Sequence, residues 1–267
     1  MTATKDILLS ELNNQGVLRL TLCDEKRRNA LSETMLKTLS AVLGETANNP
    51  DVRVIVLAAI GPAFCAGHDL KEISAKRSTA DGGQAYFTAL FSSCADVMQA
   101  IVNNPKPVIA EIAGVATAAG CQLVASCDLA VAADTSKFAT PGVNIGLFCS
   151  TPMVALSRNV SNKHAMEMLL TGDMVSATRA EQIGLINRVV EAPQLTEVTM
   201  GIAATIASKS TMTVAMGKTA FYEQQNMNLN SAYAYTSEIM VDNMLKLDAK
   251  EGISAFIEKR HPKWQDR

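Results

Sequence analysis

Two stretches decide the fold of this chain: Gly61-Pro62-Ala63-Phe64-Cys65-Ala66-Gly67-His68-Asp69-Leu70 and Ala116-Thr117-Ala118-Ala119-Gly120-Cys121-Gln122-Leu123. The first follows the apolar, β-branched run Val52–Ala59, which is typical of a strand buried on both faces. Glycine and small residues let the backbone turn tightly and approach a ligand closely. Taken alone, the first stretch favours a simple strand-to-helix turn. The second, taken alone, is equally typical of close helix–strand packing and of a ligand-binding site.

Backbone amides are the chemical feature that the two stretches share. The second stretch places free N–H groups at the start of the apolar helix Leu123–Ser126, where the helix dipole also favours negative charge. Together the stretches offer two donors that could converge on one oxygen. The carbonyl oxygen of a thioester becomes an enolate when charge builds next to it, and paired donors of this kind stabilise that charge.

The rest of the chain predicts an α/β fold with a helical tail. Strands separated by helices at this spacing imply parallel β-structure with helical crossovers. The predicted strands are Ile7–Leu12, Val17–Cys23, Val52–Ala59, Val108–Ile112, Leu129–Ala133 and Asn187–Val190. The predicted helices are one capped by Ser32 and then Gln84–Val102, Pro193–Ser208, Met212–Gln225, Leu229–Leu245 and Lys250–Glu258.

Composition excludes several classes of partner. The net charge of −2 offers no attraction to nucleic acid or to an anionic membrane, and only 4% of the residues are aromatic. No apolar run approaches the ~20 residues of a membrane span, and the start of the chain lacks the features of a signal or transit peptide. The six cysteines form no Cys-x-x-Cys pair, which indicates reduced thiols. We therefore expect a cytoplasmic protein without nucleic-acid or membrane partners.

Other motifs are weak. Gly217-Lys218-Thr219 is similar to the end of a P-loop, but Met212 stands where that motif needs glycine, so a solvated helix turn is favoured. His164 and Glu167 share a helix face without a second ligand pair, which favours surface residues over a metal site. Neither a Gly-x-Ser-x-Gly elbow nor a Gly-x-Gly-x-x-Gly fingerprint occurs.

Three motifs together resemble the crotonase (enoyl-CoA hydratase/isomerase) superfamily. They are Ala63–Leu70, Gly120-Cys121-x-Leu123 with Cys127-Asp128, and Phe138-Ala139-x-Pro141. Their order and spacing match, and the resemblance covers essentially the whole chain. It implies a spiral core of ββα units over residues 1–192. A helical oligomerisation region over residues 193–267 would then assemble a homotrimer or a dimer of trimers.

The resemblance also implies a site. The oxyanion donors would be the backbone amides of His68 and Ala119. Residues around the turn would hold coenzyme A as part of an acyl-CoA substrate, so no separate cofactor and no metal are implied. The substrate-binding residues that it implies are Lys26, Arg27, Ala66, Asp69, Leu70, Gly120 and Lys259, the last one reaching a neighbouring subunit's nucleotide.

The chain departs from this family at the two positions where hydratases carry glutamate. Gln122 and Gly142 stand there, and neither supplies a titratable proton. General acid–base catalysis commonly contributes about 10²–10⁴-fold, so this loss is expected to cripple ordinary hydration. None of the nearby polar residues is a convincing replacement base: Asp69, Glu111, Asp128, Asn144, Cys149 and Ser150.

Three hypotheses follow. The first is an acyl-CoA enzyme of fatty acid metabolism, a lyase or isomerase by family, that stabilises an enolate. The second is a catalytically silent acyl-CoA binder or regulatory protein, in which the pocket persists without its acids. The third and least favoured is a scaffold without a ligand.

Overall fold

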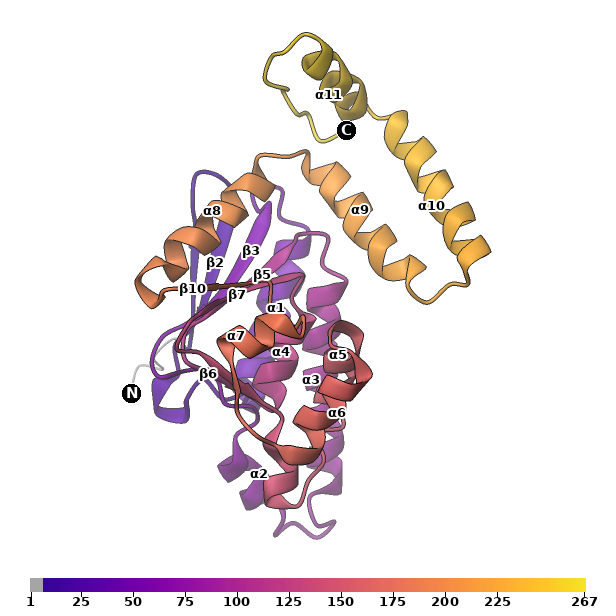
Figure 1. Cartoon of the computed structure of the whole chain (residues 1–267). Coiled ribbons are helices and arrows are strands. Elements are labelled where there is room, and N and C mark those ends of the chain that lie inside the picture. Colours follow the sequence, from indigo (N-terminus) through magenta and orange to yellow (C-terminus); the bar gives the residue numbers. More distant parts are fainter. Residues whose placement is uncertain (1–6) are drawn as a thin grey trace.

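A computed structural model describes residues 7–267, and Figure 1 shows the chain. Its core is a six-stranded sheet in the order β1-β2-β3-β5-β7-β10. β1 runs antiparallel to β2, and all other neighbours in this sheet are parallel. The strands are β1 (Leu8–Leu12), β2 (Val17–Leu22), β3 (Val54–Ala59), β5 (Val108–Ile112), β7 (Leu129–Ala133) and β10 (Arg188–Val190).

A second sheet of four short strands has the order β4-β6-β8-β9. Three strands of the first sheet are each followed by a short strand of the second, so that β4 follows β3, β6 follows β5 and β8 follows β7. This repeated winding, with helices after the strand pairs, confirms the predicted α/β spiral of ββα units. The strands are β4 (Ala63–Cys65), β6 (Val115–Thr117), β8 (Lys137–Ala139) and β9 (Val175–Ser176).

The helices cover the sheets and extend the chain. Ser32 caps α1 as predicted, because its hydroxyl oxygen accepts a hydrogen bond from the amide of Met35 at 3.2 Å. The helices of the core are α1 (Glu33–Ala47), α2 (Leu70–Lys76), α3 (Gln84–Val102), α4 (Ala119–Ser126), α5 (Pro152–Asn159), α6 (Asn162–Thr171) and α7 (Ala177–Gln182). The later ones are α8 (Leu195–Ala207), α9 (Thr211–Gln224), α10 (Leu229–Met244) and α11 (Leu247–Ile257). Short 3₁₀ turns are η1 (Glu25–Arg27), η2 (Pro141–Ile145) and η3 (Ala192–Gln194).

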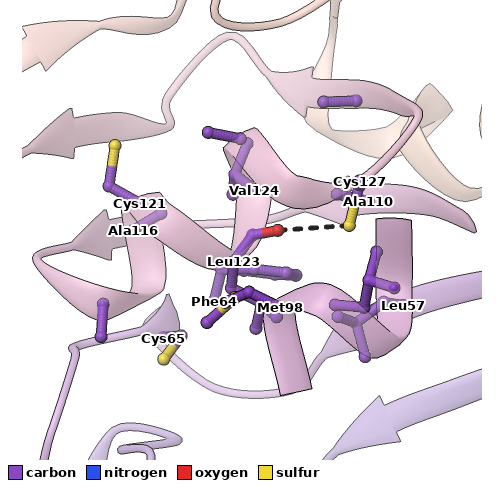
Figure 2. Packing of buried hydrophobic residues seen from close by; sticks show 14 of the residues in the cluster. Leu57, Phe64, Cys65, Met98, Ala110, Ala116, Cys121, Leu123, Val124 and Cys127 are labelled. Atoms are coloured by element: carbon purple, nitrogen blue, oxygen red, sulfur yellow. Dashed lines mark hydrogen bonds between the residues drawn. The ribbon is translucent and has the colours of Figure 1, made fainter. Parts of the chain in front are cut away.

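Helix α4 lies at the centre of the apolar core, and all eight of its residues are buried. Figure 2 shows Leu123 and Val124 of this helix among side chains from the surrounding strands and from α3. The approach of α4 to β4 requires glycine at position 120, because a Cβ there would lie 2.0 Å from the carbonyl oxygen of Cys65. Side chains on this helix therefore have little freedom to move.

Helix α3 corrects one expectation. By length and composition alone it could cross a membrane, although no apolar run of that kind was expected. Helices that pack into a protein core pass the same test, and one face of α3 is buried in the core. The buried residues of that face are Leu90, Cys94, Val97, Met98 and Ile101.

The C-terminal helices differ in where they lie. α8 packs on the main sheet, where Ala203 and Ala207 join the buried cluster of Val17, Val54 and Ile109. α9 is tied to that body by Lys218 and Tyr222, and α10 and α11 extend away from it, as Figure 1 shows. The predicted division of the chain at residue 193 stays a prediction.

Candidate functional site

The turn after β4 is held by hydrogen bonds from the segment that precedes α1. The amide of Leu31 donates to the carbonyl oxygen of Gly67 at 2.7 Å, and the amide of Ala66 donates to that of Arg28 at 3.1 Å. The buried side chain of Asn29 donates to the carbonyl oxygens of Ile60 and Ala63 at 2.9 and 2.8 Å. These bonds fix the backbone that leads into His68.

The start of α4 faces this turn. Ala118 precedes the helix with a positive φ of 51°, which is strained for a residue with a side chain. A Cβ on Gly67 would lie 3.0 Å from the Cβ of Ala118 and 3.3 Å from the amide nitrogen of Ala119. Within residues 7–267, neither the amide of His68 nor that of Ala119 donates to a protein acceptor. Both amides can therefore donate to a ligand.

The imidazole of His68 is turned into the protein. Its Nδ1 lies 3.1 Å from the carbonyl oxygen of Leu31, which can only accept, so Nδ1 carries the proton. Its ring meets that of Phe91 edge-on with centroids 5.5 Å apart. Burial lowers the pKa of His68 below its ordinary value, opposed by the bond to Leu31, and this favours the neutral ring. At position 68, therefore, the backbone amide and not the imidazole is the group that can bind a ligand.

Gln122 lies one turn along α4 from Ala119 and is only 4% exposed. Its side-chain Oε1 has no partner among the described residues. The backbone oxygen of Gln122 is occupied, because the hydroxyl of Ser126 donates to it at 2.8 Å. A neutral amide is thus buried at one of the two positions where hydratases of the resembled family carry glutamate.

Position 142, the second of these positions, is crowded. A Cβ on Gly142 would lie 3.0 Å from the Sγ of Cys149 and 3.0 Å from the carbonyl oxygen of Leu147. Burial raises the pKa of the Cys149 thiol, which keeps it protonated and unreactive. The Cys149 loop therefore occupies space that an acidic side chain at position 142 would need.

The basic residues predicted to bind coenzyme A differ in their ion pairs and in their distance from the site. The guanidinium of Arg27 lies 2.8 Å from Asp24, 3.2 Å from Glu72 and 3.7 Å from Asp69, so its charge is already matched within the chain. Lys26 is exposed in η1 and forms no ion pair with the described residues. Lys259 follows α11 on the extended helices, away from the other predicted residues.

The predicted residues that the structure brings together come from two neighbouring segments. Ala66, His68, Asp69 and Leu70 form the turn and the start of α2, where the Asp69 carboxylate caps the helix by accepting from the amide of Lys71 at 2.8 Å. Ala119, Gly120 and Gln122 form the facing turns of α4.

A groove beside Gln122 was missed by sequence reasoning. It has a volume of about 690 Å³ and runs between α3, α4, α5 and α9, with residues such as Gln122, Arg158 and Tyr222 on its walls. Four elements distant in sequence converge there, and nothing in a single one of them indicates a cavity. Its size is within the range of small-molecule sites.

Lys218 also differs from expectation. The sequence predicts a solvated helix turn there, yet the Lys218 side chain is only 7% exposed, and its Nζ lies 2.7 Å from Asp128. Tyr222 donates to the other oxygen of the same carboxylate at 2.9 Å. This network fixes α9 against the core and thereby one wall of the groove. A lysine among the apolar residues of α9 was the available signal.

The surface reading of His164 agrees with the structure. Its half-exposed ring lies 3.6 Å from Glu167 and 3.1 Å from a guanidinium nitrogen of Arg179. No group of three or more acidic, cysteine or histidine residues that could hold a metal ion occurs within residues 7–267. All six cysteines are free thiols.

Comparisons with known proteins agree with the fold and the motifs. A family model described as enoyl-CoA hydratase/isomerase matches residues 12–267. The enoyl-CoA hydratase of Mycobacterium smegmatis has a structure similar to this chain, with a TM-score of 0.93, 50% identity, and coverage of 97% of this chain and 99% of that one. The human enoyl coenzyme A hydratase domain-containing protein 3 has a TM-score of 0.92 at 49% identity, covering 97% and 100% of the two chains.

A curated relative corrects the expected location. The enoyl-CoA hydratase domain-containing protein 3 of Rattus norvegicus is 50% identical over 257 residues, which are 96% of this chain and 84% of that protein, and its name adds "mitochondrial". This finding overturns the expectation of a cytoplasmic protein. That expectation rested partly on reduced thiols, which are compatible with any reducing compartment.

Within the family, residues 116–152 resemble the third of the enoyl-CoA hydratase domain-containing proteins most, and the two relatives of that name confirm this resemblance. The match extends far beyond the short motifs that suggested it, into strands, helices and their order. This chain therefore belongs to the enoyl-CoA hydratase/isomerase family, the crotonase superfamily.

Proposed function

We propose that this chain binds acyl-CoA thioesters and stabilises negative charge on the thioester oxygen with the backbone amides of His68 and Ala119. The observation that carries this proposal is the close approach of Gly67 to the amide of Ala119, with both amides unpaired in the described protein. Ala119 is the first residue of α4, so the positive end of the helix dipole adds to the effect. Two preorganised donors of this kind stabilise an enolate in a water-excluded site.

Ordinary hydration of an enoyl thioester is not the reaction that these residues favour. Adding water needs a base to activate the water and an acid to protonate the adjacent carbon. At the two positions in question, Gln122 has a neutral amide and Gly142 has no side chain. The nearby thiol of Cys149 stays protonated because burial raises its pKa. We therefore propose an acyl-CoA enzyme that stabilises an enolate and has little hydratase activity. Its substrate would itself carry the acid or base group that the missing glutamates do not supply.

A catalytically silent acyl-CoA binder is the second candidate. It is favoured by one specific observation: both expected glutamate positions are neutral, and position 142 is filled by neighbouring atoms. In such a protein the two amides would still hold the thioester oxygen, but no proton would move.

Coenzyme A would enter as part of the substrate, with no separate cofactor. We assign its contacts to Lys26, Ala66, Asp69, Leu70 and Gly120, and place Lys259 at the site of a neighbouring subunit. Arg27 would act mainly through its ion pairs with Asp69 and Glu72, which hold the start of α2.

We further propose assembly as a homotrimer or a dimer of trimers through the C-terminal helices. Large apolar side chains along α10, at its end and on α11 are exposed to solvent in the single chain. They include Leu245, which is 79% exposed, and Phe256, which is 86% exposed. Exposed apolar surface of this kind typically marks a protein interface.

The deciding experiment incubates the protein with a panel of acyl-CoA thioesters and follows both binding and conversion by mass spectrometry. Conversion of one member supports the enzyme and removes the silent binder. Tight binding without conversion supports the binder. If no thioester binds or raises the melting temperature, the proposed function is wrong.

A further inference from the structure

The imidazole of His68 is attached to the protein by one hydrogen bond. Its Nδ1 donates to the carbonyl oxygen of Leu31 at 3.1 Å, and its ring packs edge-on against that of Phe91. The other ring nitrogen, Nε2, is buried without a partner among the described residues. The polar contact of this side chain therefore goes to a single backbone atom, in the segment that precedes α1.

Leu31 is a rigid anchor for that bond. It is fully buried and lies between Asn29 and Ser32, which are fully buried as well. The Asn29 side chain donates to two carbonyl oxygens and accepts from the amide of Asp24 at 2.7 Å, while Ser32 caps α1. Since both neighbours are fixed by hydrogen bonds, a side chain bound to the carbonyl oxygen of Leu31 is fixed with them.

The peptide unit that joins Gly67 to His68 decides where the amide of His68 points. The carbonyl oxygen of Gly67 accepts from the amide of Leu31 at 2.7 Å, and the described part of the chain has no cis peptide bond. In a trans peptide unit the C=O and the N–H point in opposite directions, so the amide of His68 points away from Leu31. Rotation of this unit would replace the donor with a carbonyl oxygen, which repels a thioester oxygen instead of stabilising it.

Glycine at position 67 makes this rotation easy on one side. A rotating peptide unit changes the ψ of Gly67 and the φ of His68, and glycine tolerates many backbone conformations. The bond from Nδ1 to Leu31 restricts the φ of His68, because the ring and the backbone of this residue share one Cα. Leu31 thus holds the unit twice, through its amide on the Gly67 side and through its carbonyl oxygen on the His68 side.

We propose that the imidazole of His68 is a positioning residue, which keeps the backbone amide of the same residue directed at the thioester oxygen by its bond to Leu31. This inference rests on the proposed acyl-CoA binding and adds a side chain to the groups that hold the two donors. Position 68 then requires a side-chain donor one bond beyond Cγ, and needs neither an aromatic ring nor a titratable group.

The test compares His68→Asn with His68→Leu, two variants of nearly the same shape. Asparagine can place an N–H donor one bond beyond Cγ, where histidine has Nδ1, and leucine has only methyl groups there. Each full-length protein binds hexanoyl-CoA labelled with ¹³C at the thioester carbon, and NMR follows the carbonyl resonance. Hydrogen bonds to the oxygen polarise the carbonyl and move this resonance downfield. His68→Asn should keep most of the wild-type shift. His68→Leu should keep less than half of it and bind about fivefold more weakly, as the loss of one hydrogen bond implies.

Two results would overturn the inference while acyl-CoA binding stands. They are an undiminished shift in His68→Leu, and an equal loss in both variants, which would assign the effect to the missing ring. If His68→Leu does not fold, ¹⁵N spectra of the wild-type imidazole decide, because the inference requires a proton on Nδ1 and none on Nε2 at neutral pH. The opposite tautomer would overturn it. A wild type that does not bind hexanoyl-CoA, or binds it without a carbonyl shift, would instead contradict the proposed function itself.

Discussion

Gly67 meets the start of α4 so closely that a Cβ on it would lie 3.3 Å from the amide nitrogen of Ala119. The same glycine has a φ of 89°, which a residue with a side chain rarely adopts. Two segments that are about fifty residues apart in sequence thus approach each other at the place where both unpaired amides lie.

Gly67→Ala should abolish binding of acyl-CoA thioesters, because the new methyl group would press on Ala118 and displace the amide of Ala119. Gly82→Ala is the matched control. Gly82 also has a positive φ, of 65°, but a Cβ there would meet nothing within 4 Å. Both variants should lose about 1 kcal/mol or more to backbone strain, measured by denaturant unfolding. Only Gly67→Ala should lose binding, and equal binding losses would count against the site.

Restoring the acids should require more than two substitutions. Gln122→Glu with Gly142→Glu supplies both carboxyl groups, but the second side chain collides with Cys149. Overpacking of this kind typically costs about 1–3 kcal/mol, so we expect this double variant to unfold more easily than the wild type. Adding Cys149→Gly removes the thiol but not the carbonyl oxygen of Leu147, so it should recover part of the stability and give crotonyl-CoA hydration at least tenfold above the wild type, followed by the loss of enoyl absorbance. Vigorous hydration by the wild type itself would contradict this account of Gln122 and Gly142.

Lys218→Met should destabilise the protein strongly. It removes the ammonium group that lies 2.7 Å from the half-buried Asp128 carboxylate, and breaking one side of a buried pair typically costs about 3–5 kcal/mol, reduced here because Val108 and Tyr222 still donate to Asp128. Lys163→Met, at an exposed position, should change the free energy of unfolding by less than about 0.5 kcal/mol. Adding Asp128→Asn to Lys218→Met should recover part of the loss. A Lys218→Met protein as stable as the wild type would show that α9 is not held by this pair.

The stability of the fold should depend on pH through His68. Its folded-state pKa is lowered by burial, so the unfolded chain binds a proton more readily than the folded one. Its stabilising effect is therefore present above the unfolded pKa of about 6.5 and is lost as the pH falls toward the folded value. Denaturant unfolding between pH 7.5 and 5 should show a smaller loss in His68→Asn than in the wild type. His261→Asn, at an exposed position, should behave like the wild type.

The sequence predicted the long elements well. Val108–Ile112, Leu129–Ala133 and Gln84–Val102 were expected with the bounds that the structure has, because continuous apolar runs and a clear helical period mark them. The strands of the second sheet are two or three residues long, too short for any period to appear. The two segments of the candidate site were found because glycine and small residues mark close backbone approach.

The remaining features depend on contacts that sequence spacing cannot give. Lys218 was misread because its partner, Asp128, lies ninety residues away in the chain. Arg27 has the charge that a phosphate needs, but three carboxylates come to it from the folded turn and from α2. The crowding at Gly142 comes from a loop that returns to it at Cys149.

The most direct test of the central claim is the infrared carbonyl band of an acyl-CoA labelled with ¹³C at the thioester carbon, bound to the protein. Two donated hydrogen bonds from His68 and Ala119 would polarise the carbonyl, so its stretching band should move to lower frequency than in water. Ala119→Pro replaces one donor with a ring carbon that points at the same oxygen, so this variant should lose the bound, shifted carbonyl band altogether. A bound thioester whose carbonyl band stays at its solution frequency would contradict the account.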